Sequence, residues 1–140
     1  MALQIPRSIY KNMVDHANEL TPVECCGYLG GNNDVVSKFY KMTNIDNSPQ
    51  HFSFDPKEQF AAVKDARKEG VKLIGVYHSH PETPARLSEE DIRLFNDPQP
   101  VYLIVSLKEE KAIIKGFKLE KPTEHDINIT TVDIDIKEGE

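Results

Sequence analysis

Two apolar segments separated by a proline-containing loop constrain the fold of this chain more than any other feature. The first, VKLIGVYHSH (residues 71–80), is strongly strand-like, and the second, VYLIVSL (residues 101–107), is a continuous apolar run typical of a strand in the middle of a sheet. Pro81 and Pro84 stiffen the loop between them, and a helix is expected from about residue 89 to residue 96. A strand, a helix and a second buried strand in this order predict an α/β domain.

Two further helices are indicated by spacing and by capping residues. Residues 7–19 carry one apolar stripe at helical spacing. Asp55 is a good N-cap, Pro56 suits the first helical position, and Gly70 is a natural end for the helix between them. The sequence therefore predicts about three helices packed around a sheet.

A hairpin and three more strands account for the other apolar segments. The run at 23–29 is expected to be a buried strand that turns at Gly30-Gly31 and pairs with residues 34–42. In the alternating tail a change of phase indicates a bulge or a turn. The sheet is expected to be mixed and largely antiparallel, and its remaining strands are 3–6, 111–119 and the tail at 126–136.

Length and charge exclude several function classes. The 140 residues predict a single domain, 1–140, whose last segment, 120–140, is a strand-like extension. No apolar run approaches the roughly 18 residues that span a bilayer, and the first residues, MALQIPRS, have no signal pattern, so we expect a cytoplasmic protein without a membrane partner. The net charge is −6 without a dense block of Lys and Arg, and a nucleic-acid partner is not expected.

The two cysteines, Cys25 and Cys26, are adjacent in the chain. Neighbouring residues rarely bridge because disulfide geometry requires a larger Cα separation than one peptide unit provides. We expect small apolar filler in a buried segment and a reducing compartment.

His78 and His80 lie two residues apart at the end of the strand-like run. Side chains alternate along a strand, so both imidazoles are expected to face one pocket, where they would supply half of a tetrahedral zinc shell. Ser79 is expected to point away from them. Alternatively, the two histidines are edge polar residues or satisfied core groups.

Asp91 is the candidate third ligand. With Ser88 as N-cap, Asp91 occupies the third position of the following helix, where the helix dipole favours a carboxylate. A His, His, Asp set is a typical shell for a catalytic zinc that keeps one position open. A capping box between Ser88 and Asp91 would explain both residues without any metal.

A water on such a metal needs a proton acceptor that is not itself a ligand. Glu24 is the candidate, because it lies in the apolar run VECCGYL, where burying a carboxylate is costly without a purpose or a partner. An exposed position at the beginning of the strand is the alternative.

Taken together, the upstream Glu24, the His-Ser-His-Pro stretch from His78 and the Ser-x-x-Asp of Ser88 and Asp91 resemble the JAMM (MPN+) metalloprotease family. The seven residues between His80 and Ser88 match the family spacing, and the resemblance covers about 3–119. Unlike the related MPN− scaffold domains, this chain lacks none of the motif residues. The resemblance implies an architecture like that of MPN domains and cytidine deaminases.

The resemblance also implies an activity. His78, His80 and Asp91 would hold one zinc ion per chain, Glu24 would transfer protons, and Ser88 would help to stabilise the oxyanion. The expected reaction is hydrolysis of amide or isopeptide bonds at the C-terminal tail of a ubiquitin-like or sulfur-carrier protein, by a compact, stand-alone prokaryotic-type enzyme. An exposed strand edge would bind such a tail by β-augmentation.

Two other functions remain open on the sequence: a non-catalytic, metal-bound interaction module and a small-molecule amidase. The oligomeric state has no sequence signal. His16 and His125 are expected at the surface. His51 is expected outside the site, with a position facing it as the alternative. Asn44 is expected to shape a loop, with orientation of a substrate or ligand as the alternative.

Overall fold

The computed structural model describes residues 2–123 and 125–138. None of the helices within these ranges is long and apolar enough to cross a membrane. The elements are β1 (Ala2–Pro6), α1 (Arg7–Leu20), β2 (Cys26–Asn32), β3 (Val35–Met42), α2 (Pro56–Glu69), β4 (Lys72–His80), α3 (Glu89–Leu94), β5 (Val101–Ser106), β6 (Ile113–Glu120) and β7 (Asn128–Lys137).

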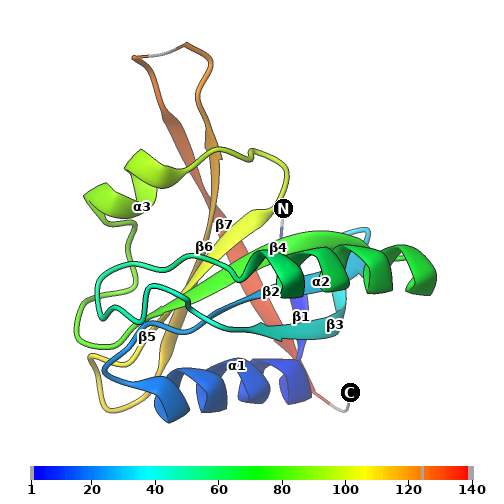
Figure 1. Ribbon diagram of the computed structural model, residues 1–140, viewed down its shortest axis with the longest axis horizontal. Coiled ribbons are helices and arrows are strands. Elements are labelled where there is room, and N and C mark those ends of the chain that lie inside the picture. The colour runs from blue at the N-terminus through cyan, green and yellow to red at the C-terminus, as the bar shows by residue number, and fades with distance from the viewer. Residues whose placement is uncertain (1, 124, 139–140) are drawn as a thin grey trace.

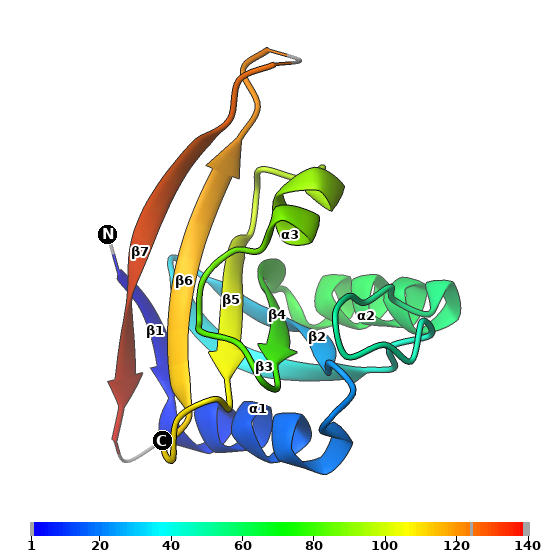
Figure 2. The ribbon, with the colours of Figure 1, turned by 90° about the vertical axis from the view of Figure 1, so that its left-hand side faces the viewer.

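The strands form a closed barrel in the order β1-β3-β2-β4-β5-β6-β7 (Figures 1 and 2). The expected mixed α/β composition and three helices are confirmed, but the sheet closes into a barrel, whereas the sequence predicts only a mixed, largely antiparallel sheet. Closure depends on β1, which pairs in parallel with β7 along its whole length and with β3 through the single register pair Gln4–Val35. These pairings join segments that are distant in the sequence, so no local pattern signals them.

Helix α2 begins and ends at the residues that its sequence indicates. The side chain of Asp55 accepts a hydrogen bond from the backbone N–H of Lys57 at 2.9 Å, and Pro56 occupies the first helical position. Gly70 ends the helix with φ 71°, in the left-handed region that glycine adopts without steric cost.

The hairpin between β2 and β3 turns three residues later than expected. Gly30 and Gly31 lie inside β2, where the pairing register with β3 shifts. The turn itself consists of Asn33 and Asp34, whose φ angles are 53° and 64°. Two residues with positive φ are what a two-residue hairpin requires, and Asn and Asp tolerate that conformation.

The tail forms one continuous strand instead of the expected bulge or turn. Residues 128–132 pair with β6, and residues 133–137 pair with β1. Ile129 is 43% exposed although Val132 is buried. The change of phase in the sequence therefore lies next to the point where the pairing partner of the strand changes from β6 to β1.

Helix α1 packs on the barrel through Ile9, Met13 and Ala17. His16, expected at the surface, is buried, and its Nδ1 lies 2.8 Å from the hydroxyl of the fully buried Tyr77. Burial lowers the pKa of His16 to about 4, and the positive charge of Lys41 adds to this effect. The imidazole is therefore neutral at pH 7 and serves as a hydrogen-bonded core group.

We predict that Gly27→Ala destabilises the fold strongly. A Cβ at residue 27 would overlap the ring of Tyr77 and the carbonyl oxygen of Tyr40, and overpacking of this kind costs about 3 kcal/mol. Gly70→Ala is the control, because no atom lies within 4 Å of its Cβ position and only the φ penalty of about 1 kcal/mol applies. Urea unfolding of both variants measures the difference, and equal losses of stability would contradict this account.

Candidate metal centre and active site

The end of β4 brings two imidazoles together. His78 and His80 are 2% and 3% exposed, and their Nε2 atoms lie 3.2 Å apart. Ser79 points away from them, as expected, and its Oγ accepts a hydrogen bond from the backbone N–H of Cys25 at 2.8 Å. Alternation along one strand thus directs both histidines into the same site.

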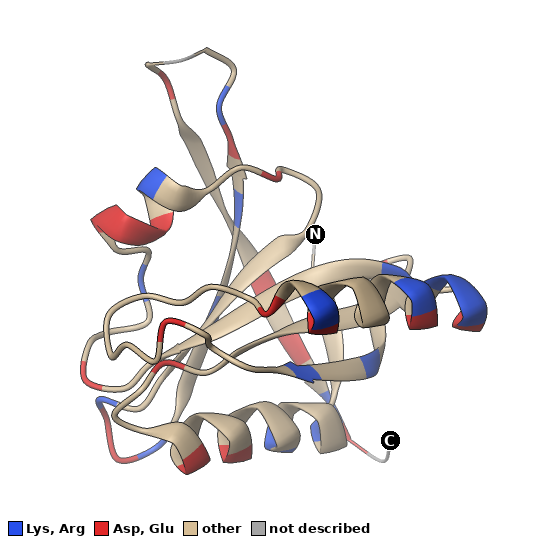
Figure 3. Ribbon diagram, in the orientation of Figure 1, with Lys and Arg blue, Asp and Glu red and all other residues tan. Residues whose placement is uncertain are grey.

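The start of α3 contributes a carboxylate through a reciprocal capping box. The backbone N–H of Asp91 donates to Ser88 Oγ at 3.0 Å, and the backbone N–H of Ser88 donates to Asp91 Oδ2 at 2.9 Å. The first turn of this helix is acidic (Figure 3), which the helix dipole favours. The capping box and the proximity to the histidines are therefore both real, and they are not alternatives.

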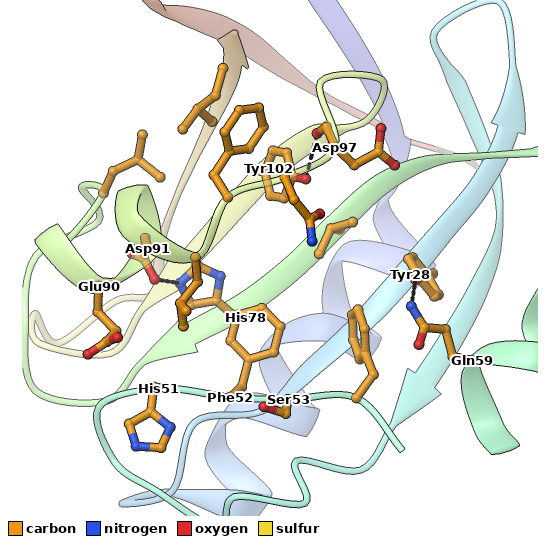
Figure 4. Close-up of a pocket in the computed structure, with 17 residues that line it drawn as sticks. Tyr28, His51, Phe52, Ser53, Gln59, His78, Glu90, Asp91, Asp97 and Tyr102 are labelled. Carbon is orange, nitrogen blue, oxygen red and sulfur yellow. Dashed lines mark hydrogen bonds and ion pairs between the residues drawn. The ribbon is translucent and has the colours of Figure 1, made fainter. Parts of the chain in front are cut away.

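The three side chains form a close cluster whose spacing fits a small metal ion. Asp91 Oδ1 lies 3.1 Å from His78 Nε2, the contact drawn in Figure 4, and Asp91 Oδ2 lies 3.2 Å from His80 Nε2. Within the part of the chain that the structure describes, this trio is the grouping of His, Cys, Asp or Glu that could hold a metal. Ligands at 2.0–2.1 Å in a tetrahedron are separated by about 3.3–3.4 Å. The two Nε2 atoms are 3.2 Å apart, and each lies at a similar distance from one of the two oxygens of Asp91.

The hydrogen bonding of His80 leaves the correct nitrogen available to a metal. Its Nδ1 lies 2.9 Å from the carbonyl oxygen of Pro84 and must donate to it. In the neutral ring the Nε2 lone pair is then directed at the cluster, the arrangement usual for metal-bound histidines. The ring of His78 is held differently, by stacking on Phe52 with centroids 4.8 Å apart.

The cluster is strongly coupled electrostatically. Burial opposes ionisation of Asp91, but the hydrogen bonds with His78 and His80 outweigh it and hold its pKa well below the usual range. For His80 burial acts to lower the pKa, and the contacts with Asp91 and the carbonyl of Pro84 reverse this, so that the pKa is raised. Asp91 is therefore an anion that attracts positive charge, whether carried by a proton or by a metal.

Glu24 lies beside this cluster because of the pairing between β2 and β4. Cys26 is in register with His78, so continuing the antiparallel ladder sets Glu24 opposite His80 and on the same face. Glu24 is 3% exposed, two residues before β2 begins, and its Oε1 has no hydrogen-bond partner among the described residues. The alternative of an exposed residue is wrong.

Burial raises the pKa of Glu24 to about 8, with His80 opposing and the negative charge of Asp91 adding to the effect. A buried carboxyl group with an unused oxygen is costly for the fold. It is also well suited to accept and return a proton, because a general base works best when its pKa is near the working pH.

A pocket of about 390 Å³ opens next to the cluster (Figure 4). His78 and Asp91 form part of its wall, and so does His51, which was not expected to face the site. The sequence does not predict the aromatic lining of this pocket, because strand pairing and loops bring the aromatic residues together from distant segments. These residues are Tyr28, Phe52, Phe54, Phe95 and Tyr102. In the sheet Tyr28 and Tyr102 flank Val76, two residues before His78 on the same face.

We predict that Glu24→Gln stabilises the metal-free protein at alkaline pH. The pKa of this carboxyl group rises from 4.5 in the unfolded chain to about 8 in the folded chain. Below pH 4.5 the group does not reduce the free energy of unfolding. As the pH rises from 4.5 to 8 the protein loses stability, because the unfolded chain releases this proton more readily than the folded one. One pKa unit corresponds to about 1.4 kcal/mol, so Glu24→Gln cannot raise the free energy of unfolding by more than about 5 kcal/mol. We expect an increase of about 2 kcal/mol at pH 8, because the structure around an ionised Glu24 relaxes.

Thermal or urea unfolding at pH 4.5 and pH 8, in the presence of a chelator, measures this gain. Glu109→Gln, at an exposed position, is the matched control and should leave stability unchanged at both pH values. A gain for Glu24→Gln that is the same at pH 4.5 and at pH 8 would show that the carboxylate is not the cause.

Comparison with known proteins gives one family. Residues 6–117 match the prokaryotic homologs of the JAB domain. A desampylase from Pyrococcus furiosus is 35% identical over 88 residues, 63% of each chain, and a CysO-cysteine peptidase from Mycobacterium bovis is 34% identical over 109 residues, covering 76% of this chain and 75% of the relative. The chain therefore spans less than two thirds of the Pyrococcus relative in that match.

A solved structure from Desulfitobacterium hafniense is 43% identical, has a TM-score of 0.85, and covers 96% of this chain and 92% of that chain. A JAB1/MPN domain protein from Archaeoglobus fulgidus, at 22% identity and a TM-score of 0.59, shares the fold. The matched segment contains Glu24 as well as β4 and α3, which carry the His-His-Asp cluster. The chain belongs to the family of prokaryotic homologs of the JAB domain.

Proposed function

We propose that this chain is a zinc-dependent hydrolase that cleaves amide or isopeptide bonds at the C-terminal tail of a ubiquitin-like or sulfur-carrier protein. The observation that carries the proposal is the His-His-Asp cluster, close enough to share one metal ion, next to a buried carboxyl group whose Oε1 has no hydrogen-bond partner among the described residues. The relatives named desampylase and CysO-cysteine peptidase support peptidase chemistry at this site.

His78, His80 and Asp91 would be the zinc ligands. The donor set supports this assignment, because two imidazoles and one carboxylate are a usual shell for a catalytic zinc. When bound, zinc would supply a positive charge that acidifies a water, polarises the scissile carbonyl group and keeps Glu24 ionised. The reciprocal hydrogen bonds of Asp91 with Ser88 hold the carboxylate in place for this role.

Glu24 would be the general base and then the general acid. Its carboxylate accepts the proton of the attacking water and returns it to the leaving amine, so the bond to the carbonyl carbon breaks without expelling an amide anion. Burial supports this role, because it keeps bulk water from the carboxyl group and makes its protonated form accessible near neutral pH.

Ser88 would donate a hydrogen bond to the developing oxyanion. Its Oγ already accepts the backbone N–H of Asp91, so its own hydrogen remains free to donate. A preorganised donor of this kind stabilises the charge that develops during acyl transfer.

The substrate tail would lie in the aromatic pocket beside His78. The sequence suggests an exposed strand edge as the binding element. β3 pairs with β1 only at Val35, so the rest of that edge of β3 has no strand partner among the described residues and stays a candidate for β-augmentation. The pocket combines an apolar wall with the acidic side chains of Glu90 and Asp97.

We also propose that residues 118–137 belong to the same domain as the matched segment. β7 lies between β6 and β1, and without it the barrel would have two open edges.

We predict one zinc ion per chain in the purified protein and little in His78→Ala. His51→Ala is the matched control, because His51 lines the same pocket outside the cluster and should leave zinc content unchanged. Elemental analysis after dialysis measures both. Full zinc content in His78→Ala would exclude the proposed ligand set.

We predict that Glu24→Gln abolishes cleavage while zinc remains bound. The assay is release of a reporter joined through an amide bond to the Gly-Gly tail of a ubiquitin-like carrier, with zinc content measured on the same sample. Cleavage of small amides without a carrier would instead identify an amidase. Zinc-dependent stability without any cleavage would identify an interaction module, and undiminished cleavage by Glu24→Gln would exclude Glu24 as the base.

A further inference from the structure

The loop that connects β3 to α2 holds the backbone of Glu24 at both of its polar groups. The N–H of Glu24 donates to the carbonyl oxygen of Ser48 at 2.9 Å, and the carbonyl oxygen of Glu24 accepts from Asn44 Nδ2 at 3.0 Å. Because β2 begins only at Cys26, these bonds fix a residue that lies outside the strand.

Asn44 uses its complete hydrogen-bonding capacity within this loop. Its Nδ2 donates to the carbonyl oxygens of Glu24 and His51, both at 3.0 Å. Its Oδ1 accepts from the backbone N–H groups of Asp46 at 3.0 Å and Ser53 at 3.2 Å. A side-chain amide has two donor hydrogens and two acceptor lone pairs, and a 6% exposed residue that uses all four has one well-defined orientation.

The same loop also contacts a candidate metal ligand. His51 and Ser53, which Asn44 bonds, lie on either side of Phe52, and the ring of Phe52 stacks on His78. Asn44 therefore ties together the segment that carries the carboxyl group of Glu24 and the aromatic ring that supports His78.

We propose that Asn44 is a positioning residue that holds Glu24 in place for proton transfer. The inference rests on the proposed hydrolase function and adds a residue that touches neither the metal cluster nor the reacting atoms. Asn44 acts through the carbonyl group of Glu24, so its removal lets the backbone at Glu24 move and misplaces the carboxylate. The His-His-Asp cluster stays in place even if Phe52 shifts, because β4 is paired on both sides and the capping box holds Asp91.

The test compares Asn44→Ala and Asn44→Asp with the wild type under zinc-saturated conditions. We expect kcat for the carrier fusion to fall about 10–100-fold in Asn44→Ala, as is typical when a supporting hydrogen bond is lost, with KM and zinc affinity unchanged. Asn44→Asp should be slower still, because its carboxylate would face two carbonyl oxygens. If Asn44 were needed only for general stability, its substitution would lower the zinc content and raise KM together, instead of lowering kcat alone.

Asn32→Asp is the matched control, because Asn32 Nδ2 donates one hydrogen bond to the carbonyl oxygen of Gly70 at an exposed position outside the site. An Asn44→Ala variant with wild-type kcat would overturn the inference while leaving the proposed function intact. Loss of cooperative unfolding in both Asn44 variants, or a fall in kcat matched by loss of zinc, would overturn it as well. If the wild type cleaved no carrier fusion, the proposed function and this inference would both fail.

Discussion

The pairing of β4 with its neighbours is the constraint on which the rest of the site depends. β4 presents His78 and His80 on one face, and its antiparallel register with β2 sets Glu24 opposite His80. Its parallel register with β5 sets Tyr102 beside Val76, and both residues line the pocket. Because side chains alternate along a strand, a shift of one residue would turn both imidazoles away from Glu24.

The local part of this arrangement could be predicted from the sequence. The ends of α2, the capping box of Ser88 and Asp91, and the shared face of His78 and His80 follow from residue types at fixed spacing, and the structure has them all. The barrel closure could not be predicted, because it depends on pairing between the first and last strands. The burial of His16 has the same origin, since its partner Tyr77 lies 61 residues away in the chain.

The site concentrates groups that a stable core would avoid. The side chains of Asp91, His80 and Glu24 are largely removed from solvent. Mutual contacts lower the pKa of Asp91 and raise that of His80, whereas burial raises the pKa of Glu24. Removing ionisable groups from water costs free energy that their mutual contacts return only in part. Such an arrangement is consistent with a site where function determines the residues, whereas the Tyr77, Leu103 and Val105 side of the barrel is packed with fully buried side chains.

The double use of Asp91 restricts which ions can be held. Its Oδ2 accepts the backbone N–H of Ser88 and also faces His80, so the carboxylate cannot swing outward without breaking the start of α3. A large, hard ion such as Ca²⁺ needs six to eight oxygen ligands at about 2.3–2.6 Å and a shell that can expand. Two imidazoles and a clamped carboxylate offer neither, so the start of α3 makes this cluster unsuitable for a large ion that requires oxygen ligands.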